Sequence, residues 1–284
     1  MKHCCLLAVI SVLFGATVGS TAQAADSEEN QTTPYASLDL AGRYNPVGVA
    51  LTGELGLRHV FRIDREHEIP AHAVALGVRG SINPANAQAG LVLHYQPVVF
   101  AHFELGYERY AYFGTNGALL SYPDDDADFS DATRTARAGE EERAGGDRLS
   151  GTVTLQLAAG RWYARQQTRW SWYHFGGEGP WYYEWEHDTL LRNADWVLSS
   201  KTSASFALWK GGQQQLLLVG PCHDVTRAFD AALTRHRIAG FGYLQLGRHP
   251  RWGRPHVYAE VGTPLVDRHR RGEMYVLGLL GTSW

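Results

Sequence analysis

Long runs in which apolar and polar residues alternate constrain this chain more than any other feature. Between Val99 and Glu108, apolar side chains occupy every second position and mostly polar ones lie between them. Similar runs cover residues 49–62, 150–157, 195–208 and 256–265. Successive side chains of a strand point to opposite faces, so each run has one apolar and one polar face. Several runs reach ten residues, whereas typical strands have about five or six. The pattern therefore favours the strands of a membrane barrel, apolar toward lipid and polar toward the lumen.

The N-terminal segment predicts export. A basic start precedes an apolar stretch at residues 4–18, and Ala22 and Ala24 are the small residues that a signal peptidase reads. We expect residues 1–24 to be a signal peptide and residues 25–34 to be a periplasmic tail. After residue 24, no apolar run reaches the roughly 20 residues of a membrane helix. Loss of Lys2 would change the formal charge from −3 to −4, and such mild acidity argues against a nucleic-acid partner. Cys222 would be the one cysteine left, which excludes an intramolecular disulfide.

Turn-forming residues divide residues 35–284 into strands. Three connections are long, at residues 114–148, 176–194 and 221–236. The first carries two acidic triplets and should be exposed and flexible, the second could form a hairpin arm above the membrane, and the third should include a helical turn at residues 227–233. Bacterial barrels have an even number of strands, long outer loops and short periplasmic turns. We therefore expect about twelve strands, with the three long connections outside and both termini inside.

Charged residues recur on the polar face of these runs. Acids and bases are nearly balanced, and unpaired charges are costly in a low-dielectric interior, so we expect pairing across strands. Two interpretations stay open, a salt-bridged and partly filled lumen or a narrow aqueous path tuned by charge rings. The candidate lumen residues are Asp39, Arg43, Glu54, Arg58, His102, Glu104, Glu108, Arg165, Arg169, Asp195, Lys201, Arg237 and Glu260, and Glu273 should also point inward.

Aromatic residues gather in the second long connection. Trp181, Tyr182, Tyr183 and Trp185 lie within five consecutive positions. They could form part of an interface girdle at the outer headgroups, or they could present rings that stack on sugars or rest on lipopolysaccharide.

Signals for catalysis are weak. The sequence contains no Gly-X-Ser-X-Gly elbow and no His-X-X-X-His pair. Ser199 and Ser200 lie on an expected strand, but nothing in the sequence brings a histidine to them. We expect no catalytic residue, metal or cofactor.

The C-terminal run ends on Trp284, with Val276, Gly278 and Leu280 on the same face. Such an end is similar to the signal that the barrel-assembly machinery reads. With the leader and the alternating runs, it makes the chain resemble Gram-negative outer-membrane β-barrel proteins as a class. One departure is that Leu277 and Leu279 are apolar on the lumen face, so this strand could pack against something inside.

This resemblance implies an all-β fold, a transmembrane antiparallel up-and-down barrel located in the outer membrane. It also implies outer-membrane lipid, lipopolysaccharide and the assembly machinery as partners, with a small-molecule solute if the lumen conducts. The function we expect is a small-solute channel or a surface-interaction barrel. The alternatives are a hydrolase of outer-membrane lipid or lipopolysaccharide, and a soluble periplasmic β-protein.

Overall fold

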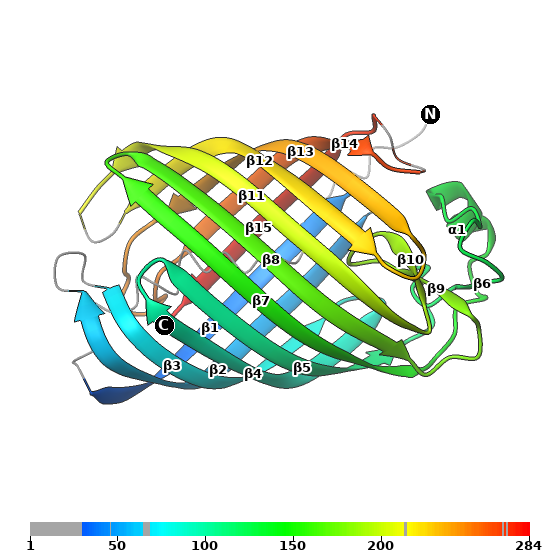
Figure 1. Cartoon of the computed structure of the whole chain (residues 1–284), viewed down its shortest axis with the longest axis horizontal. Helices are drawn as coiled ribbons and strands as arrows, with labels where there is room; N and C mark the ends of the chain where they lie inside the picture. The colour runs from blue at the N-terminus through cyan, green and yellow to red at the C-terminus, as the bar shows by residue number, and fades with distance from the viewer. Residues whose placement is uncertain (1–29, 46, 65–68, 213–214, 269, 271) are drawn as a thin grey trace.

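The computed structural model describes residues 30–45, 47–64, 69–212, 215–268, 270 and 272–284. Within them, twelve strands close into one barrel in the order β1-β15-β14-β13-β12-β11-β8-β7-β5-β4-β3-β2 (Figure 1). All twelve ladders are antiparallel, and the pairing of β1 with β15 closes the ring. The predicted fold class and strand number are therefore confirmed.

The barrel strands are β1 (Gln31–Tyr44), β2 (Gly48–Asp64), β3 (Ile69–Ile82), β4 (Asn86–Val98), β5 (Ala101–Tyr112), β7 (Gly145–Ala159), β8 (Trp162–Phe175), β11 (Ala194–Lys210), β12 (Leu216–Ala228), β13 (Leu233–Gln245), β14 (His256–Val266) and β15 (Tyr275–Ser283). The barrel begins at Gln31 rather than at Tyr35, because residues 31–34 already pair with β2. The expected signal peptide and residues 25–29 of the expected tail lie outside the described residues.

The two faces of the barrel wall differ as the alternation predicts. Large apolar side chains such as Leu55, Leu105 and Leu157 are exposed on the outside, whereas Glu104 and Glu260 point inward and are buried. The polar face of each run therefore faces the lumen. Among the described residues, no helix is long and apolar enough to cross a membrane.

The expectation of a third long connection is wrong. Residues 221–236 belong mostly to β12 and β13, which are joined by residues 229–232, and no helical turn forms there. Pro221 misled the prediction, since proline normally interrupts a sheet. It lies inside β12 opposite Gly240, and the strand continues past it with Cys222, Asp224 and Thr226 buried on the inner face.

The other two long connections fold together into a cap at one end of the barrel (Figure 1). The cap contains helix α1 (Asp131–Ala136) and a small sheet of β6 (Ser121–Tyr122), β9 (Trp181–Glu184) and β10 (Thr189–Arg192). Its core includes Leu119, Leu120 and Leu190, each 0% exposed. The first connection is thus a packed structure rather than a loose chain, although residues 124, 126 and 140 are exposed as expected.

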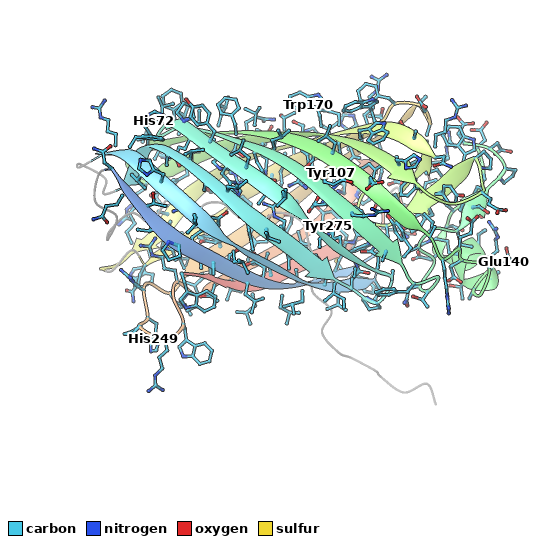
Figure 2. All side chains as sticks on the ribbon, turned by 90° about the horizontal axis from the view of Figure 1, so that it is seen from below. His72, Tyr107, Glu140, Trp170, His249 and Tyr275 are labelled. Atoms are coloured by element: carbon cyan, nitrogen blue, oxygen red, sulfur yellow. The ribbon has the colours of Figure 1, made fainter. Side chains whose placement is uncertain are left out.

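We call this the capped end. The opposite, terminal end carries the C-terminus (Figure 1). The loop of His249 lies at this end, whereas Glu140 lies at the capped end (Figure 2).

Candidate functional site

The turn of the β9–β10 hairpin, residues 185–188, enters the lumen from the capped end. We call these residues the hairpin tip. Arg43 of β1 donates hydrogen bonds to the carbonyls of Trp185 and Glu186, and Tyr173 of β8 forms a 3.1 Å hydrogen bond with the His187 ring. Five strands separate β1 from β8 by either route around the ring. The tip therefore bridges opposite walls of the barrel.

Two carboxylates of the tip are held by arginines. Arg148 of β7 lies 2.6 Å from Glu186, and the same guanidinium also pairs with Glu108 of β5. Asp188 lies 3.1 Å from Arg235 of β13 and 2.6 Å from Arg270, which precedes β15. These ion pairs are buried: Asp188 is 1% exposed, and Arg148, Arg235 and Arg270 are 2%, 7% and 5% exposed. Charged contacts from the wall thus fix the tip inside the lumen.

The environment of the hairpin sets the charge of its titratable groups. Burial, reinforced by the neighbouring Glu186, raises the pKa of Glu184 to about 8. Burial, together with Arg148 and Arg169, lowers the pKa of His187 well below its usual range. Burial alone would raise the pKa of Asp188, but Arg235, Arg270 and Arg43 outweigh it and hold the pKa below its usual range. At neutral pH the docked tip therefore contains a charged Asp188 and a neutral His187, next to a mostly protonated Glu184.

A second charged network lies on the wall formed by β2 to β5. Arg79 of β3 donates to Glu54 at 2.8 Å and to both carboxylate oxygens of Glu104 at 2.9 Å. His94 lies 2.7 Å from Glu54, and the Tyr35 hydroxyl donates to the same carboxylate at 2.8 Å. Tyr35 reaches it by lying over Gly77, where an added Cβ would be 2.4 Å from the hydroxyl.

Arg169 of β8 connects this network with the tip, since its guanidinium lies 3.7 Å from Glu104 and 3.7 Å from Glu186. On the other side of the lumen, Lys201 pairs with Glu260, and Arg237 lies 2.9 Å from Asp224. A cavity of about 50 Å³ lies between these groups and the tip, with Leu277 in its lining. That volume can hold water.

The predicted lumen residues have partners inside the barrel, some in these networks and some beside them. Asp39 lies 3.3 Å from His256, His102 stacks on His94, Arg58 lies over the Tyr35 ring, and Arg165 donates to Gln167 at 3.2 Å. Eight other predicted residues do lie in the networks around the tip and along the wall: Arg43, Glu54, Glu104, Glu108, Arg169, Lys201, Arg237 and Glu260.

Two predicted inward residues have other roles. Asp195 is buried at the start of β11, where it accepts hydrogen bonds from the backbone of Arg192, Trp196 and Asp230 and so fixes the connections at the rim. Glu273 lies on the connection between β14 and β15 rather than on a strand, and its side chain is 49% exposed. The expectation that Glu273 points into the lumen is therefore wrong.

The aromatic connection is neither a lipid girdle nor an exposed stacking surface. Tyr182 and Tyr183 are 0% and 1% exposed inside the cap, and Trp181 packs against the same core. Trp185 lies in the tip, with the Arg43 guanidinium 5.5 Å from its ring centroid. These rings point inward because the hairpin folds back over the barrel mouth. Trp284, by contrast, is 43% exposed and is held by backbone hydrogen bonds to Ala36 at the terminal end.

Sequence reasoning missed several residues of the site. Arg79 escaped because the inward positions before it on β3 are Ala73, Ala75 and Gly77, whose small side chains hide the alternation. Arg148 falls within an expected loop because Gly145 and Gly146 lie shortly before it in the sequence. Glu186 and Asp188 carry no signal in the sequence, because a loop that folds into a lumen has the composition of one that folds outward.

Ser199 and Ser200 lie on opposite faces of β11, and Ser199 lines the lumen cavity. Ser200 lies on the outer face, where the Gln166 amide donates to its hydroxyl at 2.6 Å. Among the described residues, no serine hydrogen bonds to a histidine, and no group of three or more potential metal ligands is present.

Comparison with known proteins finds likeness in fold only. No protein-family model and no curated protein matches the sequence. The β domain of the Bordetella autotransporter BrkA is 12% identical and has a TM-score of 0.44, with 89% of this chain and 97% of that chain covered. Outer-membrane expressed OmpT of Vibrio cholerae is 8% identical and has a TM-score of 0.38, with 91% and 99% covered. The closed ring, the apolar outside and the charged inside together give this chain the architecture of an outer-membrane β-barrel.

Proposed function

We propose that the protein is a gated small-solute channel of the outer membrane, closed in the described state by the hairpin tip. The observation that carries this proposal is the set of hydrogen bonds and ion pairs by which Arg43, Arg148 and Arg235 hold the tip across the lumen. The chain would be exported by its signal peptide and inserted by the barrel-assembly machinery.

The chemistry of the contacts favours a reversible closure over a permanent filling. Buried ion pairs can often be replaced by packed apolar side chains without loss of stability. A barrel that needed only to be filled would therefore gain little from burying charges such as Arg148 and Glu108. Polar contacts can be exchanged for water when the tip leaves, so they suit an element that moves.

The wall beyond the tip suits a solute path. Arg79, Glu104, Lys201 and Glu260 line it with paired charges of both signs. A path lined in this way would be hydrated once the tip is withdrawn, and its selectivity between cations and anions would be weak.

Loop lengths favour an orientation in which the cap faces the cell surface. The cap collects both long connections, residues 113–144 and 176–193, whereas the opposite end carries the C-terminus and shorter connections such as residues 246–255 (Figure 1). Bacterial barrels place long loops outside and short turns in the periplasm. The tip would therefore close the channel from the cell surface, where a change in the medium can reach it.

Liposome swelling tests this proposal. Residues 185–188 would be replaced by Asn-Gly, a pair that forms a two-residue hairpin turn. We expect this variant to admit sugar-sized solutes much faster than the wild type. A matched control removes residues 124–126 from the cap. It should behave as the wild type does, because residues 124 and 126 are exposed and the contacts of this segment with Arg268 lie on the surface.

Heat-modifiable migration in gels would first show that each protein is folded. A folded tip variant that remains impermeable would contradict the channel and favour the surface-interaction barrel. Release of fatty acid from outer-membrane lipid by the wild type would favour the hydrolase.

A further inference from the structure

A cluster of hydrogen-bonding side chains interrupts the apolar outside of the barrel. It crosses β8, β11, β12 and β13, and we call it the outer polar patch. Its members are Gln166, Thr168, Ser200, Thr202, His223 and His236.

The patch is a connected set of contacts. The Gln166 amide donates to Ser200 at 2.6 Å, and its carbonyl accepts a hydrogen bond from Thr202. Thr202 lies opposite His223 in the ladder, and the His223 and His236 rings stack with their centroids 5.4 Å apart. Thr202 and His223 are both exposed. The group therefore presents polar atoms outward rather than hiding them in the wall.

Aromatic residues place Gln166, the patch member on β8, near the middle of the hydrocarbon zone. On β8, Trp162 and Trp170 are exposed on the outer face, 63% and 44%, and Gln166 lies midway between them in the strand. A tilted strand rises along the barrel axis by roughly 2.5 Å per residue, so Gln166 lies about 10 Å from either tryptophan. Outward tryptophans mark the two interfaces of an apolar band about 25 Å tall. Gln166 therefore lies near the centre of that band.

The opposite side of the barrel has an ordinary lipid-facing surface. The outer faces of β2, β3 and β4 carry Leu55, Leu57, Leu76, Val78, Leu91 and Leu93, which are 40–65% exposed. Lipid tails offer no hydrogen-bond partner, so a polar group that faces them loses the bonds it makes in water. The asymmetry between the two sides indicates that something other than lipid covers the outer polar patch.

We propose that the patch is the contact surface of a symmetric dimer, with a second copy of this chain as its partner. Hydroxyl, amide and imidazole groups both donate and accept hydrogen bonds. A patch made of them is complementary to itself, as a two-fold axis requires, whereas a charged patch would repel its own copy. Gly240 and Gly242 adjoin it on β13, and an added Cβ would meet no described atom within 4 Å at either position. These two positions carry no side chain and face open space, which leaves room for a second barrel to approach.

Apolar substitution separates a contact surface from a lipid-facing one by the sign of its effect. If the patch faces lipid, Gln166→Leu with His223→Leu should leave a monomeric barrel unchanged or more stable. If it faces a second copy, the same double variant should lower the dimer fraction in mild detergent and in bilayers by at least tenfold, while the barrel stays folded in heat-modifiable gels. His174→Leu is the matched control. His174 is exposed on the outer face of β8 beyond Trp170, outside the patch, so its replacement should leave association unchanged.

Cysteine cross-linking in native membranes locates the contact. In a Cys222→Ser background, Thr202→Cys should form disulfide-linked dimers, and Val78→Cys on the opposite wall should not. A wild type that is monomeric in bilayers, or equal cross-linking at both positions, would overturn the proposal. So would fatty-acid release that depends on Ser200 together with unchanged association of the double variant, because the patch would then act on lipid.

Discussion

Replacing Asp188 with asparagine should release the hairpin tip from the barrel wall. The Asp188 carboxylate lies 3.1 Å from Arg235, 2.6 Å from Arg270 and 2.6 Å from the Tyr183 hydroxyl. Asparagine keeps the size of the side chain and removes its charge. Loss of one partner from a buried ion pair costs about 3–5 kcal/mol. Both arginines retain another carboxylate, Asp267 and Asp131, each at 2.5 Å. We therefore expect the lower end of the range, about 3 kcal/mol, which is roughly a hundredfold shift toward the undocked tip.

Hydrogen exchange of the hairpin measures this shift. In the docked state the Glu186 and His187 amides donate to Glu184 at 3.0 and 2.7 Å, and they should be protected. In the Asp188→Asn variant, a peptide covering residues 181–192 should exchange about a hundred times faster. Asp126→Asn is the control, since its ion pair with Arg268 is on the surface. Exchange at the wild-type rate in the Asp188 variant would refute the view that these ion pairs hold the tip.

Three further perturbations test other parts of the account. The raised pKa of Glu184, about 8, means that the docked state binds the extra proton between the ordinary value of 4.5 and 8, so docking should weaken as pH rises through this window. Solute flux should accordingly rise with pH, and Glu184→Gln should remove that dependence; flux that is flat in the wild type would count against it. Asp188 has a lowered pKa and acts in the opposite direction, so docking should also weaken as pH falls below its ordinary value of 3.8. Leu155→Arg puts a charge toward lipid at a cost of about 2–4 kcal/mol, so the yield of folded barrel should fall. Val47→Arg in the exposed β1–β2 turn should fold normally, and equal yields of the two variants would contradict the lipid-facing assignment of Leu155. Arg79→Met leaves Glu54 and Glu104 without the arginine they share, so the free energy of unfolding in urea should drop by about 3–5 kcal/mol. Adding Glu104→Gln should restore part of that loss, and an unchanged free energy of unfolding in Arg79→Met would contradict the role of this network.

The barrel wall could be predicted because each strand must place apolar side chains on one face and polar side chains on the other. Lipid outside and water or paired charges inside impose a period of two, so residues such as Glu104 and Leu105 fall on opposite faces whatever the partner strands are. An even number of strands then brings the first and the last strand to begin and end at the same end of the barrel.

The docking of the hairpin tip in the lumen could not be predicted, because it depends on contacts between distant segments. Asp188 meets Arg235 and Arg270 only after the cap has folded over the mouth. Local rules also misled where tertiary structure overrides them: Pro221 indicated a loop but lies within β12, and the aromatic residues at 181–185 indicated a surface but pack inside the cap.

Single-channel recording of the wild type and the Asn-Gly tip variant in the same planar bilayers tests the central claim most directly. The account predicts a wild type that is closed for most of the record and a tip variant that conducts steadily, with weak selectivity between cations and anions. Equal conductance of the two folded proteins, whether both open or both silent, would show that the hairpin tip is not what closes this barrel.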